Sequence, residues 1–450
     1  MESPEDFALV NPTQGPAPFT PGADLRSYDE QPWTIEILLG AADPAFTSQL
    51  VLEAIEAGAD RVALRLDSTV DELPGPDGHQ SRASAGESGM VVCRAADFAR
   101  LFESVDPGRL FLLADQLAAP IAACFVAAAR SVGREWRSFG ISNDPLGEAF
   151  SSGAANPEAW ALRACRDLAL WLAAEAPQAT RQTLGAGAEH STAAAAPEVA
   201  AVLAHAAEYR RMGFGETLRA RFACGHRVLD EAAKFRAARE AHWRRFGGGA
   251  SLQIEAVSRM ESLGAPQADV NLVRISLQAM AAALGGARTI CLLPCQMDRA
   301  SVRLAVRTQQ LLAAETGVTR VADPAAGSEA IERKTARFAG EALELAVQDL
   351  PSAWQALRSR GADRHQPVVG VTMFTTPNAS PKTAPRAPSA WFEALARDRE
   401  QRDQMALDDT LLRLRNAARG TGNLMPALIE AAECHATLGE MFISLRDCQK

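Results

Sequence analysis

The chain has 450 residues, a formal net charge of −9 and an ordinary apolar share of 47%. Such a chain can bury a large core, and its negative charge argues against non-specific binding to nucleic acid. No apolar run is long enough to cross a bilayer and no secretion signal is present, so we expect a cytoplasmic protein without membrane association. The eight cysteines lie mostly in apolar segments, which indicates reduced thiols, and Cys291 with Cys295 alone makes a poor zinc site.

Residues 1–30 are rich in Pro, Gly and Asp and predict an extended N-terminal arm. From residue 31 to 376, short β-like runs alternate with helical stretches. Eight such runs predict an α/β fold, a (β/α)8 TIM-type barrel with its helices outside. A long polar loop, residues 67–89, follows the first run and would lie at the barrel face where active sites are built. The predicted strands are residues 61–66, 110–114, 137–142, 181–185, 219–224, 252–257, 289–293 and 319–322.

The part of the chain after the barrel strands predicts a change of architecture. Residues 367–374 read as one more buried strand, and residues 377–389 form a Pro-rich linker of the semi-rigid kind. Residues 390–450 predict a helical C-terminal region. Within it, residues 390–418 read as a charged helix that ends at Gly420, and residues 423–445 as two short helices.

The segment from 271 to 328 carries polar residues and glycines at the spacing of a known family. It resembles the barrel domain of methylmalonyl-CoA mutase and its acyl-CoA mutase relatives. The matching positions are Asn271, Arg274, Gln278 and residues 284–286, 307–309, 315–317, 323–324 and 327–328. Similar segments at 18–20, 32–35, 89–102, 140–144, 234–239, 402–403, 423–426, 430–431 and 437–440 extend the resemblance over nearly the whole chain. It implies a barrel that positions a radical formed from adenosylcobalamin.

Several positions that carry chemistry in that family are replaced here. The resemblance places Leu38 at a tyrosine, Ser142 at a glutamine, and Gly187 and Cys291 at two histidines. A positioned acid or hydrogen-bond donor supplies ~10²–10⁴ in rate, so the joint loss predicts negligible turnover and no catalytic residue on this chain. Two further departures are Ala186 at an aromatic position, with His190 three residues beyond Gly187, and the run 253–257 at a segment with Arg, His and Gln.

The resemblance also bears on cofactor and partner. In the family, the helical linker leads into a cobalamin-binding domain marked by Asp-x-His-x-x-Gly. The sequence ends at Lys450 before such a domain, and Asp363 with His365 is a chance match that has Val368 at the glycine. The resemblance therefore implies the small, non-catalytic subunit of a heterodimeric mutase, whose full-length catalytic partner binds adenosylcobalamin. In that complex the partner interconverts methylmalonyl-CoA and succinyl-CoA, and the N-terminal arm wraps it.

Two other functions stay open at this point. One is an active acyl-CoA mutase subunit with an altered substrate and a separate cobalamin-binding chain. In that case Leu38, Gly187 and Cys291 would tune substrate choice. The other is a barrel that assists assembly or protection of a mutase without being a stoichiometric subunit.

Two cationic residues are candidates for ligand contact. Lys234 and Arg236 could contact coenzyme A phosphates, although a solvated charged helix face is the interpretation that we favour. The sequence predicts no metal ligand set. Packing and helix-end hydrogen bonds explain Asn271, Arg274 and Gln278 better than substrate contact, and His205, His226 and His242 are read as structural or surface groups.

Overall fold

The fold is known from a computed structural model of the chain. It describes residues 32–67, 85–86, 89–114, 117–151, 157–179, 183–185, 194–214, 218–247, 252–259, 263, 268–321, 323–346, 369, 373–374 and 386–449. The predicted arm at 1–30, most of the loop at 67–89 and most of the linker at 377–389 lie outside these residues.

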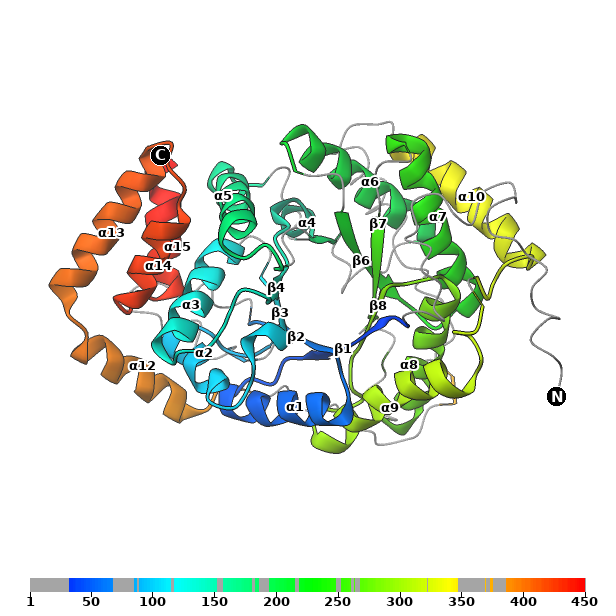
Figure 1. Cartoon of the computed structure of the whole chain (residues 1–450), viewed down its shortest axis with the longest axis horizontal. Coiled ribbons are helices and arrows are strands. Elements are labelled where there is room, and N and C mark those ends of the chain that lie inside the picture. Colours follow the sequence, from blue (N-terminus) through cyan, green and yellow to red (C-terminus); the bar gives the residue numbers. More distant parts are fainter. Residues whose placement is uncertain are drawn as a thin grey trace.

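Eight parallel strands form one curled sheet at the centre of the molecule (Figure 1). Their order is β4-β3-β2-β1-β8-β7-β6-β5, so the first and last strands of the chain pair with each other, as they do in a barrel. This confirms the predicted α/β fold of the TIM type. The strands are β1 (Thr34–Leu39), β2 (Arg61–Arg65), β3 (Leu110–Leu113), β4 (Gly140–Ile141), β5 (Thr183–Gly185), β6 (Leu218–Cys224), β7 (Leu252–Ser258) and β8 (Thr289–Leu292).

Helices surround the sheet, and α10 forms a second layer outside α6 and α7 (Figure 1). Among the described residues, no helix has the length and apolar character required to cross a membrane. The helices are α1 (Pro44–Ala57), α2 (Ala95–Phe102), α3 (Ala118–Ser131), α4 (Pro145–Ser151), α5 (Ala159–Glu175), α6 (Ala195–Arg211), α7 (Val228–Phe246), α8 (Ala268–Leu284), α9 (Arg299–Glu315), α10 (Glu329–Ala346), α12 (Ser389–Gln401), α13 (Gln404–Arg419), α14 (Met425–Glu433) and α15 (Leu438–Arg446).

One predicted strand was wrong, and one real strand was missed. Residues 319–321 form turns after α9, where Gly317 adopts a positive φ of 77° that favours glycine. Thr316 and Thr319 donate their hydroxyls to carbonyls near the end of α9, so these β-branched residues close a helix instead of extending a sheet. The missed strand is β1, whose TIEILL sequence pairs with β2 and β8. The strand predicted first, at residues 61–66, is therefore β2, and each later predicted strand up to 289–293 is likewise shifted by one place in the barrel.

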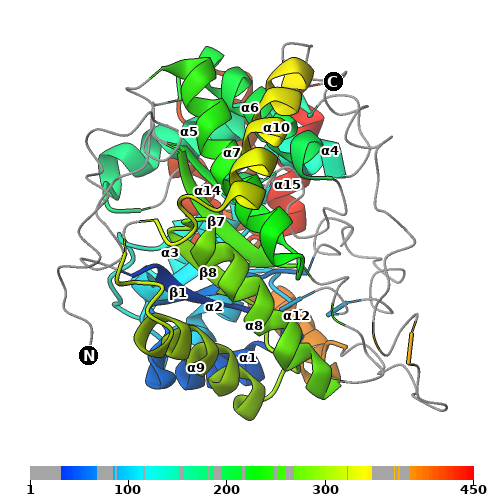
Figure 2. The same ribbon diagram turned by 90° about the vertical axis from the view of Figure 1, so that its right-hand side faces the viewer.

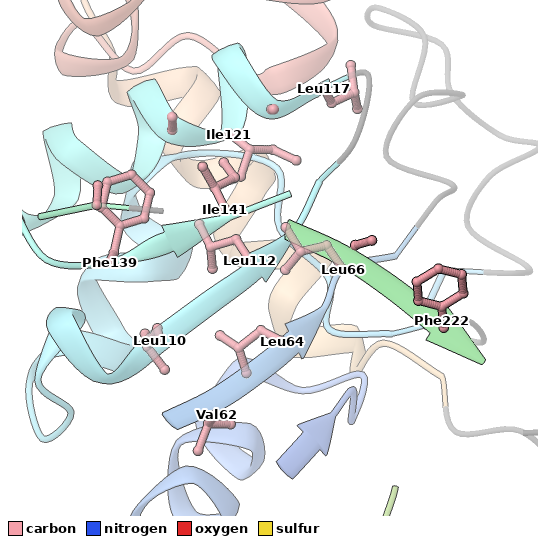
Figure 3. Packing of buried hydrophobic residues seen from close by; sticks show 14 of the residues in the cluster. Val62, Leu64, Leu66, Leu110, Leu112, Leu117, Ile121, Phe139, Ile141 and Phe222 are labelled. Atoms are coloured by element: carbon pink, nitrogen blue, oxygen red, sulfur yellow. The ribbon is translucent and has the colours of Figure 1, made fainter. Parts of the chain in front are cut away.

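Side chains alternate between the barrel interior and the surrounding helices, because successive residues of a strand point to opposite faces. On β1, Ile37 and Leu39 belong to the large outer core, whereas Leu38 belongs to a separate inner cluster. Figure 3 shows Leu112 of β3 and Ile141 of β4 on the side of the sheet that faces Ile121 of α3.

The C-terminal helices pack onto the barrel beside α2, α3 and α5 (Figure 1). The indole of Trp391 on α12 donates to Asp97 of α2 at 3.0 Å, and the Leu438 amide donates to the Cys93 carbonyl at 2.7 Å. The single helix predicted at 390–418 is divided into α12 and α13. Asp403 accepts hydrogen bonds from two amides of α13 and so caps its start.

The strand predicted at 367–374 is not a buried strand where it is described. Val369 and Met373 form an isolated bridge with each other, and both are exposed. In contrast, the two short helices predicted near the C-terminus are confirmed as α14 and α15.

Candidate functional site

Two of the positions that the resemblance implies to be replaced lie together inside the barrel. Leu38 of β1 and Cys291 of β8 are at most 1% exposed and pack in one cluster with Ala63, Phe111 and Val257. Leu293 completes this cluster. The cluster is apolar apart from the Cys291 thiol.

A network of charged side chains occupies the same interior. Glu36 of β1 lies two residues before Leu38 and therefore points to the same side of the sheet. Arg221 of β6 donates through one Nη1 atom to Glu36 at 3.1 Å and to Glu255 of β7 at 3.1 Å. Arg61 of β2 bonds both carboxylates, reaching Glu255 at 3.2 Å. Arg219 of β6 also bonds Glu255, at 3.1 Å, so four strands contribute to the network.

Phe111 of β3 links the charged and the apolar groups. The guanidiniums of Arg61 and Arg221 lie 4.7 Å and 4.9 Å from the centre of its ring, within the range of cation–π attraction. The second Nη atom of Arg221 lies 3.6 Å from the Cys291 sulfur. The interior is therefore held by contacts among its own side chains.

The charges of this network stabilise one another against the cost of burial. Burial raises the pKa of Glu255, but Arg61, Arg221 and Arg219 outweigh it and lower that pKa to about 2. Burial lowers the pKa of Arg61, but Glu36 and Glu255 outweigh it and leave the value raised. A carboxylate with a pKa this low is a poor proton acceptor at neutral pH, so Glu255 is unsuited to general acid–base catalysis.

Of the other two positions implied to be replaced, the structure describes Ser142 but not Gly187. Ser142 follows β4 and is 3% exposed; its hydroxyl accepts a hydrogen bond from the Ala114 amide at 2.8 Å. It therefore satisfies the backbone at the end of β3. Gly187, with Ala186 and His190, lies outside the described residues.

The two coenzyme A candidates are buried, so the solvated-face interpretation was wrong. Lys234 of α7 bonds Glu198 at 2.9 Å, Glu231 at 2.6 Å and the Ala223 carbonyl at 2.5 Å. Burial lowers the pKa of Lys234, but Glu198 and Glu231 outweigh it and raise that pKa. These partners come from α6, the end of β6 and α7 itself, so Lys234 is buried among these elements.

Arg236 forms ion pairs with α10 and with the segment that precedes it. It bonds Asp323 at 2.5 Å and Glu332 of α10 at 3.0 Å. Contact of either cation with coenzyme A stays a prediction, and it would require an exchange of these ion pairs.

The remaining polar residues of the resemblance also make internal bonds. Asn271 accepts from Arg274 at 2.7 Å, and Arg274 also donates to the Val369 carbonyl. His205 and His242 are buried, and burial with the charge of Arg210 lowers the pKa of His242 to about 4. Among the described residues, no group of three or more His, Cys, Asp or Glu could hold a metal ion.

The interior charges were not predicted from sequence as a network. A signal was present, because Glu36, Arg61, Arg221 and Glu255 sit in otherwise apolar strand segments. Only the register, which sets Glu36 beside Arg61 and Arg221 beside Glu255, shows that they meet.

The fold and this interior define an α/β barrel protein in which charged and apolar side chains fill the centre of the sheet. The family model of methylmalonyl-CoA mutase matches residues 3–450, and the chain belongs to this family. It is 27% identical to a methylmalonyl-CoA mutase of Rhizobium meliloti over 97% of this chain and 69% of the relative. It is 26% identical to a methylmalonyl-CoA mutase large subunit of Streptomyces virginiae over 97% of this chain and 67% of the relative.

A solved structure of Rhizobium etli pyruvate carboxylase also matches, with 13% identity over 92% of this chain and 36% of that chain. Its TM-score of 0.34 is too low to carry an argument about fold or function.

The mutase family uses adenosylcobalamin as its radical source. The described interior does not fit that chemistry. The resemblance implies a tyrosine at Leu38 and a histidine at Cys291, and the two side chains present instead pack in the apolar cluster, with the Cys291 sulfur facing Arg221. We therefore derive no reaction step through this cofactor on this chain.

Proposed function

We propose that this chain is the small, catalytically degenerate subunit of a heterodimeric adenosylcobalamin-dependent methylmalonyl-CoA mutase. Its partner is the full-length catalytic subunit, which binds adenosylcobalamin and interconverts methylmalonyl-CoA and succinyl-CoA. The isolated chain is expected to be inactive. We place the complex in the cytoplasm, a reducing compartment that suits buried thiols such as those of Cys93, Cys124 and Cys224.

The filled barrel interior is the observation that carries the proposal. Glu36, Arg61, Arg221 and Glu255 are bonded to one another within the sheet. Removing one member of a buried pair leaves an uncompensated charge, which costs about 3–5 kcal/mol. A ligand that entered this interior would have to break several such pairs. This supports a structural role for the barrel over a catalytic one.

The test is assembly with a catalytic mutase subunit. The purified chain is mixed with the methylmalonyl-CoA mutase large subunit from the same organism and separated by size exclusion with mass detection. The proposal predicts a one-to-one complex. A wild-type chain that never binds the large subunit would contradict it, and would favour an assembly or protection protein if substoichiometric amounts raise the yield of active mutase.

A further inference from the structure

Helices α8 and α9, which lie side by side on the barrel, both carry large apolar side chains that are exposed in the described part of the chain. Val273 and Leu277 of α8 are 60% and 40% exposed, and Leu304 and Leu311 of α9 are 46% and 49% exposed. We call these four side chains the α8–α9 face. Figure 2 looks onto the two helices, which contact each other side by side. Exposed apolar side chains on two neighbouring helices are a candidate interaction surface.

Helical periodicity explains why these residues form continuous stripes. Val273 and Leu277 are four residues apart, and Leu304 and Leu311 are seven apart, so each pair lies on one side of its helix. Their helices bury the opposite side, which includes Ile275 and Ala279 on α8 and Val302 on α9. The core therefore does not require apolar residues on the outer stripes.

A further exposed apolar segment is attached to α8 by a hydrogen bond. The guanidinium of Arg274 donates to the Val369 carbonyl and so holds residue 369 against this helix. Val369, Met373 and Phe374 are all exposed, and Phe374 has a positive φ of 53°, which is strained for an aromatic residue. Such strain is consistent with a segment that is shaped for contact.

Several other outer helices are covered by later parts of the chain. Helix α10 packs outside α6 and α7, and α14 and α15 pack against α3. The C-terminal helices and the α8–α9 face lie on different sides of the barrel (Figure 1). In the described part of the chain, no later helix covers α8 and α9, so a partner could bind there directly.

The charges beside the patch argue against a second copy of this chain as the occupant. Helix α9 carries Arg299, Arg303 and Arg307 and no acidic residue before Glu315. Arg299 and Arg303 share a single carboxylate, Glu53 of α1. A two-fold dimer through this face would bring two such arginine ridges to one interface, where like charges repel. A different chain with an acidic rim fits better.

We propose that the α8–α9 face is the docking surface for the catalytic mutase subunit, whose contacting surface is apolar with an acidic rim. This inference rests on the proposed function and specifies where the partner binds. Leu304 and Leu311 form its α9 stripe, and the arginines of α9 form one border that steers association.

The test uses a double variant, Leu304→Glu with Leu311→Glu, in the full chain. Its dissociation constant for the large subunit is measured by titration, next to the matched control Met405→Glu with Leu412→Glu on α13. All four residues are exposed, at 46%, 49%, 83% and 50%, so both variants should fold, which circular dichroism and thermal melting check. We expect binding at least about 30-fold weaker for the α9 variant and within about threefold for the control.

The possible outcomes separate this inference from the proposed function. If wild type and the α9 variant bind the large subunit equally, the docking surface is wrong and the proposed function stands. If the wild-type chain does not bind the large subunit at all, both the docking surface and the proposed function are contradicted. If the chain alone forms a dimer that the α9 variant abolishes, the occupant is a second copy and the inference is overturned. As an independent readout, Arg307→Glu should slow association and reduce its dependence on salt.

Discussion

Arg221 of β6 and Glu255 of β7 are register partners on adjacent strands, and their side chains form a 3.1 Å ion pair inside the barrel. This pair joins Glu36 and Arg61 across the interior. Buried ion pairs are poor evidence for net stability, but a broken one is costly. The network therefore makes the barrel sensitive to the loss of any one member.

Removal of the Glu255 charge should destabilise the fold. In Glu255→Gln, three arginines lose a shared carboxylate, and we expect the free energy of unfolding to fall by about 3–5 kcal/mol in urea titrations. The control is Glu433→Gln, which breaks an exposed pair with Arg130 and should change stability by less than about 1 kcal/mol. Equal effects of the two changes would show that the network is not buried as described.

The free energy of unfolding should also depend on pH through the carboxylate of Glu255. Its pKa falls from 4.5 in the unfolded chain to about 2 in the fold, so its contribution is complete above pH 4.5. The contribution is lost as the pH falls from 4.5 through about 2, because the unfolded state then binds the proton first. The difference in unfolding free energy between wild type and Glu255→Gln should shrink across this window. A difference that stays constant down to pH 2 would contradict the assignment.

Restoring the family side chains should not restore catalysis. Leu38→Tyr with Cys291→His places two larger polar groups in a packed interior beside Arg221. We expect no mutase turnover with adenosylcobalamin and a loss of stability of about 1–3 kcal/mol per site from overpacking. Turnover by this double variant would mean that these two positions alone separate the chain from an active mutase.

The contact between Trp391 and Asp97 should hold α12 on the barrel. Trp391→Phe keeps the aromatic packing but removes the indole donor, which leaves a buried carboxylate oxygen with one bond fewer. We expect a loss of about 1–3 kcal/mol and faster amide hydrogen exchange in residues 389–401. Trp243→Phe on α7 is the matched control, since Trp243 is 37% exposed. Unchanged exchange in α12 would rule out this anchoring role.

Strand periodicity predicted the barrel because seven of its strands are short apolar runs between helical stretches. It failed at the described residues 319–321, because Thr316 and Thr319 close α9 around Gly317 instead of extending a sheet. Family resemblance directed attention to Leu38 and Cys291, which do lie together in the interior. The network around them depends on strand register, and the burial of Arg236 depends on α10, which starts nearly a hundred residues later; neither can be read from local sequence.

The most direct measurement is mutase turnover by the purified chain with adenosylcobalamin and methylmalonyl-CoA, alone and after mixing with the catalytic large subunit. We expect no turnover by the chain alone and full turnover in the one-to-one mixture, with unchanged activity when this chain carries Cys291→Ala. Turnover by the chain alone would contradict the account, because it would mean that the filled interior is a working active site.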